Sequence, residues 1–209
     1  MLFKRVLVLA PHTDDGELGC GGTIDRLVNS GTEVHYAAFS IAERSVSEEY
    51  PSDILGTEVR NATAILGISK DCLHIYNYDV RNFQKCRQEI LEDLVILNRS
   101  IDPDIIFLPS INDIHQDHHV IAREGVRAFK FKSVMGYELP WNNLTINTAC
   151  FVELDYENIN NKIRALGCYE SQQGKKYFSS EFIKALAVTR GTQIGVQYAE
   201  VFEVIRWII

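Results

Sequence analysis

The chain has 209 residues, 46% of them hydrophobic and 23% charged, which is ordinary for a soluble globular domain. A formal net charge of −7, with no dense cluster of Lys and Arg, argues against a nucleic-acid-binding protein. The five cysteines are scattered and form no C-x-x-C pair, which argues against a disulfide framework or a thiolate zinc site and favours a reducing compartment. We therefore expect one domain over residues 1–209, located in the cytoplasm and without a membrane span.

Apolar runs typical of buried strands alternate along the chain with helical patterns. Strands are expected at residues 5–10, 34–39, 73–76 and 104–108, and helical spacing marks 18–28, 59–66, 90–98 and 122–129. Further along, strands are expected at 134–139, 150–153 and within 200–209, and helices around 156–169 and 181–189. Strands with unbroken apolar runs, separated by helices, predict an α/β fold: a Rossmann-like, doubly wound, mostly parallel sheet with helices on both faces.

Two clusters of acidic and histidine residues follow the first and the fourth of these strands. The first cluster reads Pro11-His-Thr-Asp-Asp-Gly-Glu17, and the second reads Asp113-Ile-His-Gln-Asp-His-His119. A solvated loop does not need such crowding, and a core would not tolerate it unpaired. In the common doubly wound order the first and fourth strands are neighbours, so the two clusters should meet at the carboxyl edge of the sheet.

The residue types in these clusters are those of a hydrolytic zinc site. His12 and Asp15, with His118 as the third ligand, would leave one coordination position for a water molecule, whose pKa zinc lowers to about 7. Asp14 is placed to take the water's proton. We expect His115 to face the developing oxyanion as a cation, with Asp117 bonded to it and raising its pKa. Iron(II) can occupy a similar ligand set.

The segment Ala10-Pro-His-Thr-Asp-Asp-Gly-Glu17 resembles the Ala-His-Pro-Asp-Asp-x-Glu motif of the PIG-L/LmbE-like family of zinc-dependent amino-sugar deacetylases. His115-Gln-Asp-His118 resembles the second motif of that family, His-x-Asp-His, and looser matches follow in the same order along the chain. The resemblance implies a Rossmann-like fold and an N-acetylated amino sugar or conjugate as the small-molecule partner. It also implies zinc bound by His12, Asp15 and His118, Asp14 as general base, and His115 paired with Asp117 as oxyanion stabiliser.

The sequence departs from the family pattern where relatives bind the sugar. The Pro after the motif His is replaced by Thr13, and the Arg three residues before the helix Glu is replaced by Leu55. Arg44 and Arg60 are alternative candidates to replace that Arg, and Glu138 and Glu200 are candidate pocket residues. The particular N-acyl substrate stays open, and so does the oligomeric state, a homo-oligomer included.

Two other functions fit parts of the sequence. The first is a nucleotide-dependent Rossmann oxidoreductase or methyltransferase, with the glycines between residues 16 and 22 cradling the cofactor, although their spacing is not G-x-G-x-x-G. It leaves both acid/His clusters unexplained, and close packing of the first helix is the simpler role for the glycines. The second is a non-catalytic sugar- or metal-binding relative, which would hold zinc but release no amine.

Overall fold

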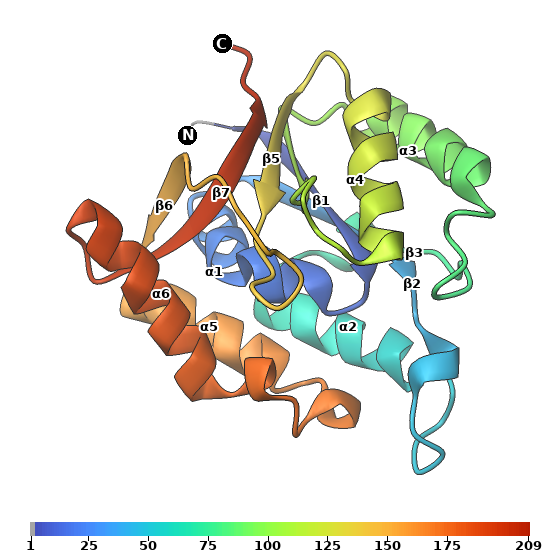
Figure 1. Ribbon diagram of the computed structural model, residues 1–209, viewed down its shortest axis with the longest axis horizontal. Coiled ribbons are helices and arrows are strands. Elements are labelled where there is room, and N and C mark those ends of the chain that lie inside the picture. The colour runs from blue at the N-terminus through green and yellow to red at the C-terminus, as the bar shows by residue number, and fades with distance from the viewer. Residues whose placement is uncertain (1–2) are drawn as a thin grey trace.

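A seven-stranded mixed sheet forms the centre of the computed structural model, which describes residues 3–209 (Figure 1). The strands are β1 (Arg5–His12), β2 (Glu33–Ser40), β3 (Leu73–Ile75), β4 (Ile105–Pro109), β5 (Ser133–Tyr137), β6 (Cys150–Leu154) and β7 (Tyr198–Arg206). Their order is β3-β2-β1-β4-β5-β7-β6. The strands β1 to β5 pair in parallel, and β7 is antiparallel to β5 and β6. The predicted doubly wound, mostly parallel sheet is confirmed.

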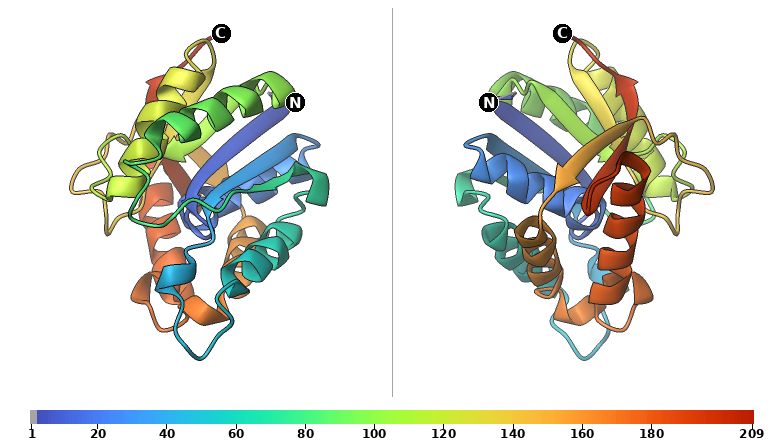
Figure 2. Two further views of the ribbon diagram at one scale, coloured as in Figure 1. Left: turned by 90° about the vertical axis from the view of Figure 1, so that its right-hand side faces the viewer. Right: turned by 90° about the vertical axis from the view of Figure 1, so that its left-hand side faces the viewer.

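Helices cover both faces of this sheet. They are α1 (Asp15–Asn29), α2 (Ile54–Ile65), α3 (Arg87–Ile101), α4 (Gln116–Ala128), α5 (Tyr156–Leu166) and α6 (Ser180–Ile194). The helices α3 and α4 lie on one face, and α1, α2, α5 and α6 lie on the other (Figure 2). In residues 3–209 no helix combines the length and the apolar character needed to cross a bilayer.

The apolar strands are buried on both sides because each face of the sheet has its own core. Val6, Val8 and Ala10 of β1 pack under α1, α2, α5 and α6. Leu7 and Leu9, which point the other way, pack under α3 and α4. Two covered faces explain why the run shows no alternation with polar residues.

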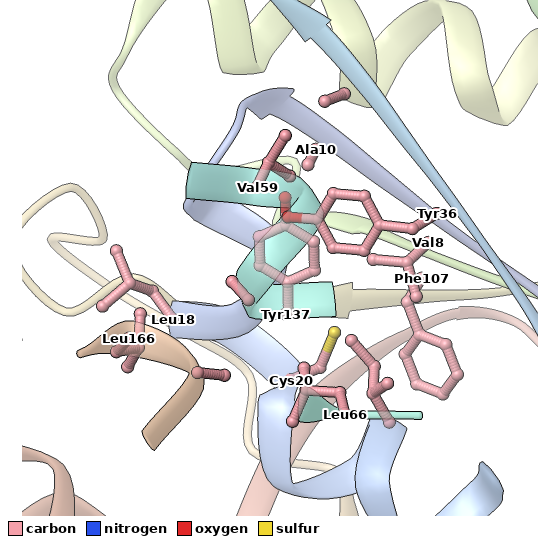
Figure 3. Packing of buried hydrophobic residues seen from close by; sticks show 14 of the residues in the cluster. Val8, Ala10, Leu18, Cys20, Tyr36, Val59, Leu66, Phe107, Tyr137 and Leu166 are labelled. Carbon is pink, nitrogen blue, oxygen red and sulfur yellow. The ribbon is translucent and has the colours of Figure 1, made fainter. Parts of the chain in front are cut away.

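The glycines near the start of α1 are required by packing. A Cβ on Gly16 would collide with the ring of Tyr36, and a Cβ on Gly19 would collide with the ring of Tyr137. Both tyrosines belong to the larger core, where their rings lie close to the first turns of α1 (Figure 3). These glycines therefore let α1 approach the sheet, and the nucleotide-binding alternative loses the feature that suggested it.

Candidate metal centre and active site

Two short connections at the carboxyl edge of the sheet place the acid/His clusters side by side. The strand β1 ends at His12 and α1 begins at Asp15, so only two residues separate them. The helix α4 begins at Gln116, with His115 as its N-cap. Because β1 and β4 are parallel neighbours, both clusters emerge at the same edge and come into direct contact.

Three side-chain atoms from these clusters form a compact triangle. The Oδ2 atom of Asp15 lies 3.1 Å from Nδ1 of His12 and 3.2 Å from Nε2 of His118. The two imidazole nitrogens are 3.3 Å apart. A tetrahedral zinc ion with bonds of 2.0–2.1 Å separates its ligand atoms by about 3.4 Å. The triangle therefore fits one face of a zinc tetrahedron, and the fourth corner is left for solvent or substrate.

The electrostatics of the triangle also suit a cation. Burial lowers the pKa of His12, but Asp117 and Asp15 outweigh it and raise the value to about 9. Burial likewise opposes the charge on His118, but Asp15 and Asp113 raise its pKa to about 10. The surrounding carboxylates thus hold two protons on the imidazoles, and a divalent ion would displace both of them on binding.

Each histidine of the triangle is held from behind by a buried carboxylate. Nε2 of His12 lies 3.2 Å from Asp117, and Nδ1 of His118 lies 2.8 Å from Asp113. Such contacts fix the ring orientation and leave the opposite nitrogen for the metal. The sequence placed Asp113 inside the second cluster, but its partner could not be assigned without the fold.

Replacing Asp113 or Asp117 by asparagine should weaken zinc affinity about 10- to 100-fold, because the ligand histidine then loses the charged acceptor that fixes the orientation of its ring. Competition with a chromogenic chelator measures this affinity. Asp53→Asn, an exposed carboxylate before α2, is the control and should bind zinc like the wild type. Wild-type affinity in both Asp113 and Asp117 variants would mean that these carboxylates do not orient the ligands.

The expected pair between Asp117 and His115 does not form. The Asp117 carboxylate accepts the backbone N–H of Arg81 at 2.6 Å and of Phe83 at 3.3 Å, and it also contacts His12. Nδ1 of His115 instead accepts the backbone N–H of Asp117 at 3.2 Å, so the ring proton of neutral His115 sits on Nε2.

The environment of His115 argues against the expected cation. Burial, reinforced by the nearby His118 and His12, lowers the pKa of His115 to about 4. A neutral imidazole with its proton on Nε2 still donates a hydrogen bond, as an oxyanion stabiliser must.

Asp14 follows His12 by two residues and lines the same cavity as the triangle. Burial, together with the charge of neighbouring Asp15, raises the pKa of Asp14 to about 6. A carboxylate with a pKa near neutrality is suited to accepting and returning a proton.

A buried network fixes the peptide just before Asp14. The hydroxyls of Tyr36 and Tyr169 both contact the Glu17 carboxyl group, and they lie 2.9 and 2.6 Å from the carbonyl oxygen of Thr13. Burial raises the pKa of Glu17 to about 8, so its carboxyl group holds a proton at neutral pH and can donate one hydrogen bond within this network. Nothing in the sequence pointed to this network, because the tyrosines come from distant segments.

The triangle opens into a cavity of about 300 Å³. On one side the rings of Trp141 and Tyr177 stack with centroids 4.0 Å apart. Polar groups come from Arg81, Asn142, Gln172 and Lys175. Arg81 has a φ of +66°, a costly conformation for a non-glycine residue, and its N–H binds Asp117. Arg81 and Lys175 lie in irregular segments, Tyr177 lies in the 3-10 turn Lys176–Phe178, and none of the three carried a sequence signal.

The three residues proposed from the sequence for substrate binding do not line this cavity. Arg44 is two-thirds exposed and pairs with Asp79 at 3.2 Å. Glu138 is buried and accepts two hydrogen bonds from Arg190, at 2.9 and 2.8 Å. Each of these two charges is already paired within the chain, which argues against a substrate-binding role.

Glu200 has a structural position inside the fold. Its carboxylate lies 2.7 Å from Nζ of Lys162 and accepts the backbone N–H groups of Gly22 and Thr23 at 3.0 and 2.7 Å. These two N–H groups follow a kink in α1, where Cys20 departs from helical backbone angles. Glu200 therefore caps the second half of α1 and neutralises a buried lysine.

Glu200→Ala should lower the free energy of unfolding by about 3–5 kcal/mol, because it leaves the Lys162 ammonium buried without its carboxylate partner, with only the carbonyl oxygen of Leu18 to accept from it. Urea denaturation measures the loss. Glu153→Ala, an exposed glutamate on the neighbouring strand β6, is the control and should stay within about 0.5 kcal/mol of the wild type. A variant of unchanged stability with a raised KM would instead return Glu200 to substrate binding.

Comparison with known proteins places this site in a family. A sequence model of the PIG-L family, described as GlcNAc-PI de-N-acetylase, matches residues 7–129. The uncharacterised deacetylase YaiS of Escherichia coli is 28% identical, over 80% of this chain and 91% of that protein. The diacetylchitobiose deacetylase of Thermococcus kodakarensis is 24% identical, over 94% of this chain and 81% of that protein.

Solved structures share the fold. The N,N'-diacetylchitobiose deacetylase of Pyrococcus horikoshii superimposes with a TM-score of 0.82 and 22% identity, covering 98% of this chain and 84% of that one. GalB of Pseudomonas putida, a 4-carboxy-2-hydroxymuconate hydratase, has a TM-score of 0.80 and 20% identity, covering 99% and 98%. Proteins with this fold catalyse more than one reaction. Similarity of fold therefore does not identify the family of this chain, and similarity of sequence is needed. Since the family model spans more than half of the chain and includes both acid/His clusters, the chain belongs to the PIG-L family of de-N-acetylases, enzymes that hydrolyse amide bonds.

Proposed function

We propose that this protein is a zinc-dependent deacetylase that removes the acetyl group from an N-acetylated amino sugar or sugar conjugate, releasing acetate and the free amine. The observation that carries the proposal is the triangle of His12, Asp15 and His118, with edges of 3.1–3.3 Å, beside Asp14 in an open cavity. The deacetylases among the similar proteins support the same reaction.

His12, Asp15 and His118 would hold the metal, and iron(II) would suit the same donor set. When bound there, zinc supplies a Lewis acid for the amide carbonyl and lowers the pKa of water to about 7. The chain contributes the rigidity of this site, because Asp113 and Asp117 lock both imidazoles.

Asp14 moves the proton in this mechanism. It accepts a proton from the attacking water as the new C–O bond forms. It then returns that proton to the amide nitrogen as the C–N bond breaks, so that the amine leaves neutral. The network of Glu17, Tyr36 and Tyr169 supports this role by fixing the preceding carbonyl of Thr13.

His115 stabilises the charge that develops on the carbonyl oxygen. Its Nε2–H is free to donate because Nδ1 already accepts the backbone N–H of Asp117. Because this donor is neutral, it stabilises the oxyanion through a directed hydrogen bond and is not repelled by the positive charge of the bound cation.

The walls of the cavity favour a sugar. The stacked rings of Trp141 and Tyr177 offer an apolar surface to the C–H face of a pyranose ring, and Arg81, Asn142 and Lys175 offer hydrogen bonds to its hydroxyl groups. Arg81 and Lys175 would bind the hydroxyl groups of the sugar, which is the role that the sequence suggested for Arg44.

A direct test measures acetate and amine release from N-acetylglucosamine, diacetylchitobiose and a GlcNAc glycoside. We expect at least one of them to be deacetylated, the activity to disappear on chelation and to return with zinc. A protein that binds zinc in the triangle but releases no amine from any amide in a wider panel would be the non-catalytic relative. Activity that survives complete metal removal would refute the zinc mechanism.

A further inference from the structure

A second group of metal-ligating side chains lies at the opposite end of the sheet. The strands β2 and β3 form its outer edge (Figure 1). They pair in parallel with Ala37 opposite His74. Since side chains alternate along a strand, Glu33 and His35 of β2 point to the same side as His74 of β3. Cys72 is the last residue of the 3-10 turn Lys70–Cys72, which leads directly into β3. The start of β2, the strand β3 and the turn before it therefore bring four potential ligands together.

These side chains are close enough to share an ion. One ligand atom each of Glu33, His35 and Cys72 lies within 4.8 Å of the others. Nε2 of His35 is 3.1 Å from the Glu33 carboxylate, and its Nδ1 is 3.2 Å from Nε2 of His74. Cys72 is a free, half-buried cysteine. The cluster is thus partly open to solvent, which gives an ion a way in.

The chemistry of the cluster selects a zinc-class cation. Carboxylate, imidazole and thiolate are the three ligand types that zinc binds, and a thiolate disfavours magnesium and calcium. An ion on Nε2 of His35 leaves the Nδ1–H to donate to His74, whose ring stacks on that of His35 at a centroid distance of 5.5 Å. His74 would therefore orient His35 in the way that Asp113 and Asp117 orient the catalytic ligands.

We propose that Glu33, His35 and Cys72 form a second binding site for a zinc-class divalent cation, with His74 as the residue that positions His35. Binding releases the thiol proton of Cys72 to solvent and ties the edge strand β3 to β2. His35 precedes Ser40, the neighbour of His12, by five residues, so the two sites are separated by about 17 Å along the sheet. They would hold separate ions, and this site does not depend on the deacetylase function.

Cobalt(II) distinguishes the two sites spectroscopically, because only a thiolate ligand produces a sulfur-to-cobalt charge-transfer band in the near ultraviolet. The catalytic triangle contains no cysteine, so the band reports the second site alone. We expect wild type and His118→Ala to show the band, and Cys72→Ser to lose it. Cys86→Ser removes another half-buried thiol and should keep it. No band in the wild type, or a band that survives Cys72→Ser, would overturn the proposal.

A second measurement needs no variant. Saturating zinc should slow alkylation of Cys72 by iodoacetamide about tenfold or more in the wild-type protein, since a ligated thiolate is a poor nucleophile, while Cys86 reacts at its usual rate. Peptide mass spectrometry follows both thiols in one sample. Equal Cys72 rates with and without zinc would exclude the site, even if the catalytic triangle binds its own ion.

Discussion

His118→Ala is expected to lose one bound zinc ion per chain and to reduce deacetylation roughly 10³-fold or more. The variant removes one corner of the ligand triangle and takes away the imidazole that faces the buried Asp113 carboxylate. A Lewis acid contributes several kcal/mol to transition-state stabilisation, and each 1.4 kcal/mol is about tenfold in rate. Elemental analysis after dialysis and an amine-release assay measure the two losses.

His119→Ala is the matched control for this variant. His119 is the next residue of α4 and is half-buried, and its side chain lies outside the cavity that contains the triangle. The control should keep the zinc content and turnover of the wild type. If His118→Ala retained its full zinc content, His118 would not be an important ligand, and the triangle would have to be replaced by another set, such as one that includes His115.

Asp14→Asn is expected to keep its zinc but to lower kcat about 10²- to 10⁴-fold, the range that general acid–base catalysis contributes. The amide has nearly the size of the carboxylate but cannot accept a proton at neutral pH. Because Asp14 lies outside the ligand triangle, metal content should not change. Parallel zinc analysis and turnover measurements therefore separate proton transfer from metal binding.

Asp79→Asn tests whether any nearby carboxylate would have the same effect. Asp79 is half exposed and pairs with Arg44, and its side chain does not line the cavity. It should retain both zinc and turnover. A near-wild-type rate in Asp14→Asn would assign the general base to another residue.

The shared fold of the GalB hydratase gives these two experiments added weight. A hydratase adds water across a carbon–carbon double bond and releases neither acetate nor amine. The fold alone therefore does not decide between the two reactions. Amine release that depends on both Asp14 and His118 would tie the deacetylase reaction to these side chains.

Local sequence was sufficient for the framework of this protein. Unbroken apolar runs such as residues 5–10 predicted buried parallel strands, because a strand covered on both faces needs no polar alternation. Positions directly after a strand must lie at the carboxyl edge of the sheet, so the approach of His12 to His118 followed from strand order alone. The helix α6 extends beyond its predicted end at residue 189 and stops at Ile194, where Gly195 adopts the left-handed backbone conformation (φ of +77°) of a helix C-cap.

Partnerships between charged side chains were decided only by the tertiary structure. The expected pairing of Asp117 with His115 gave way to one with His12, and Glu200 proved to be bound by Lys162. Spacing along the chain determines the edge and the face on which a residue lies. It does not determine which donor from a distant element comes within 3 Å, because that depends on strand register, helix packing and side-chain rotamer together. Substrate contacts such as Arg81 and Tyr177 depend on the same long-range geometry, so they could be found only in the folded molecule.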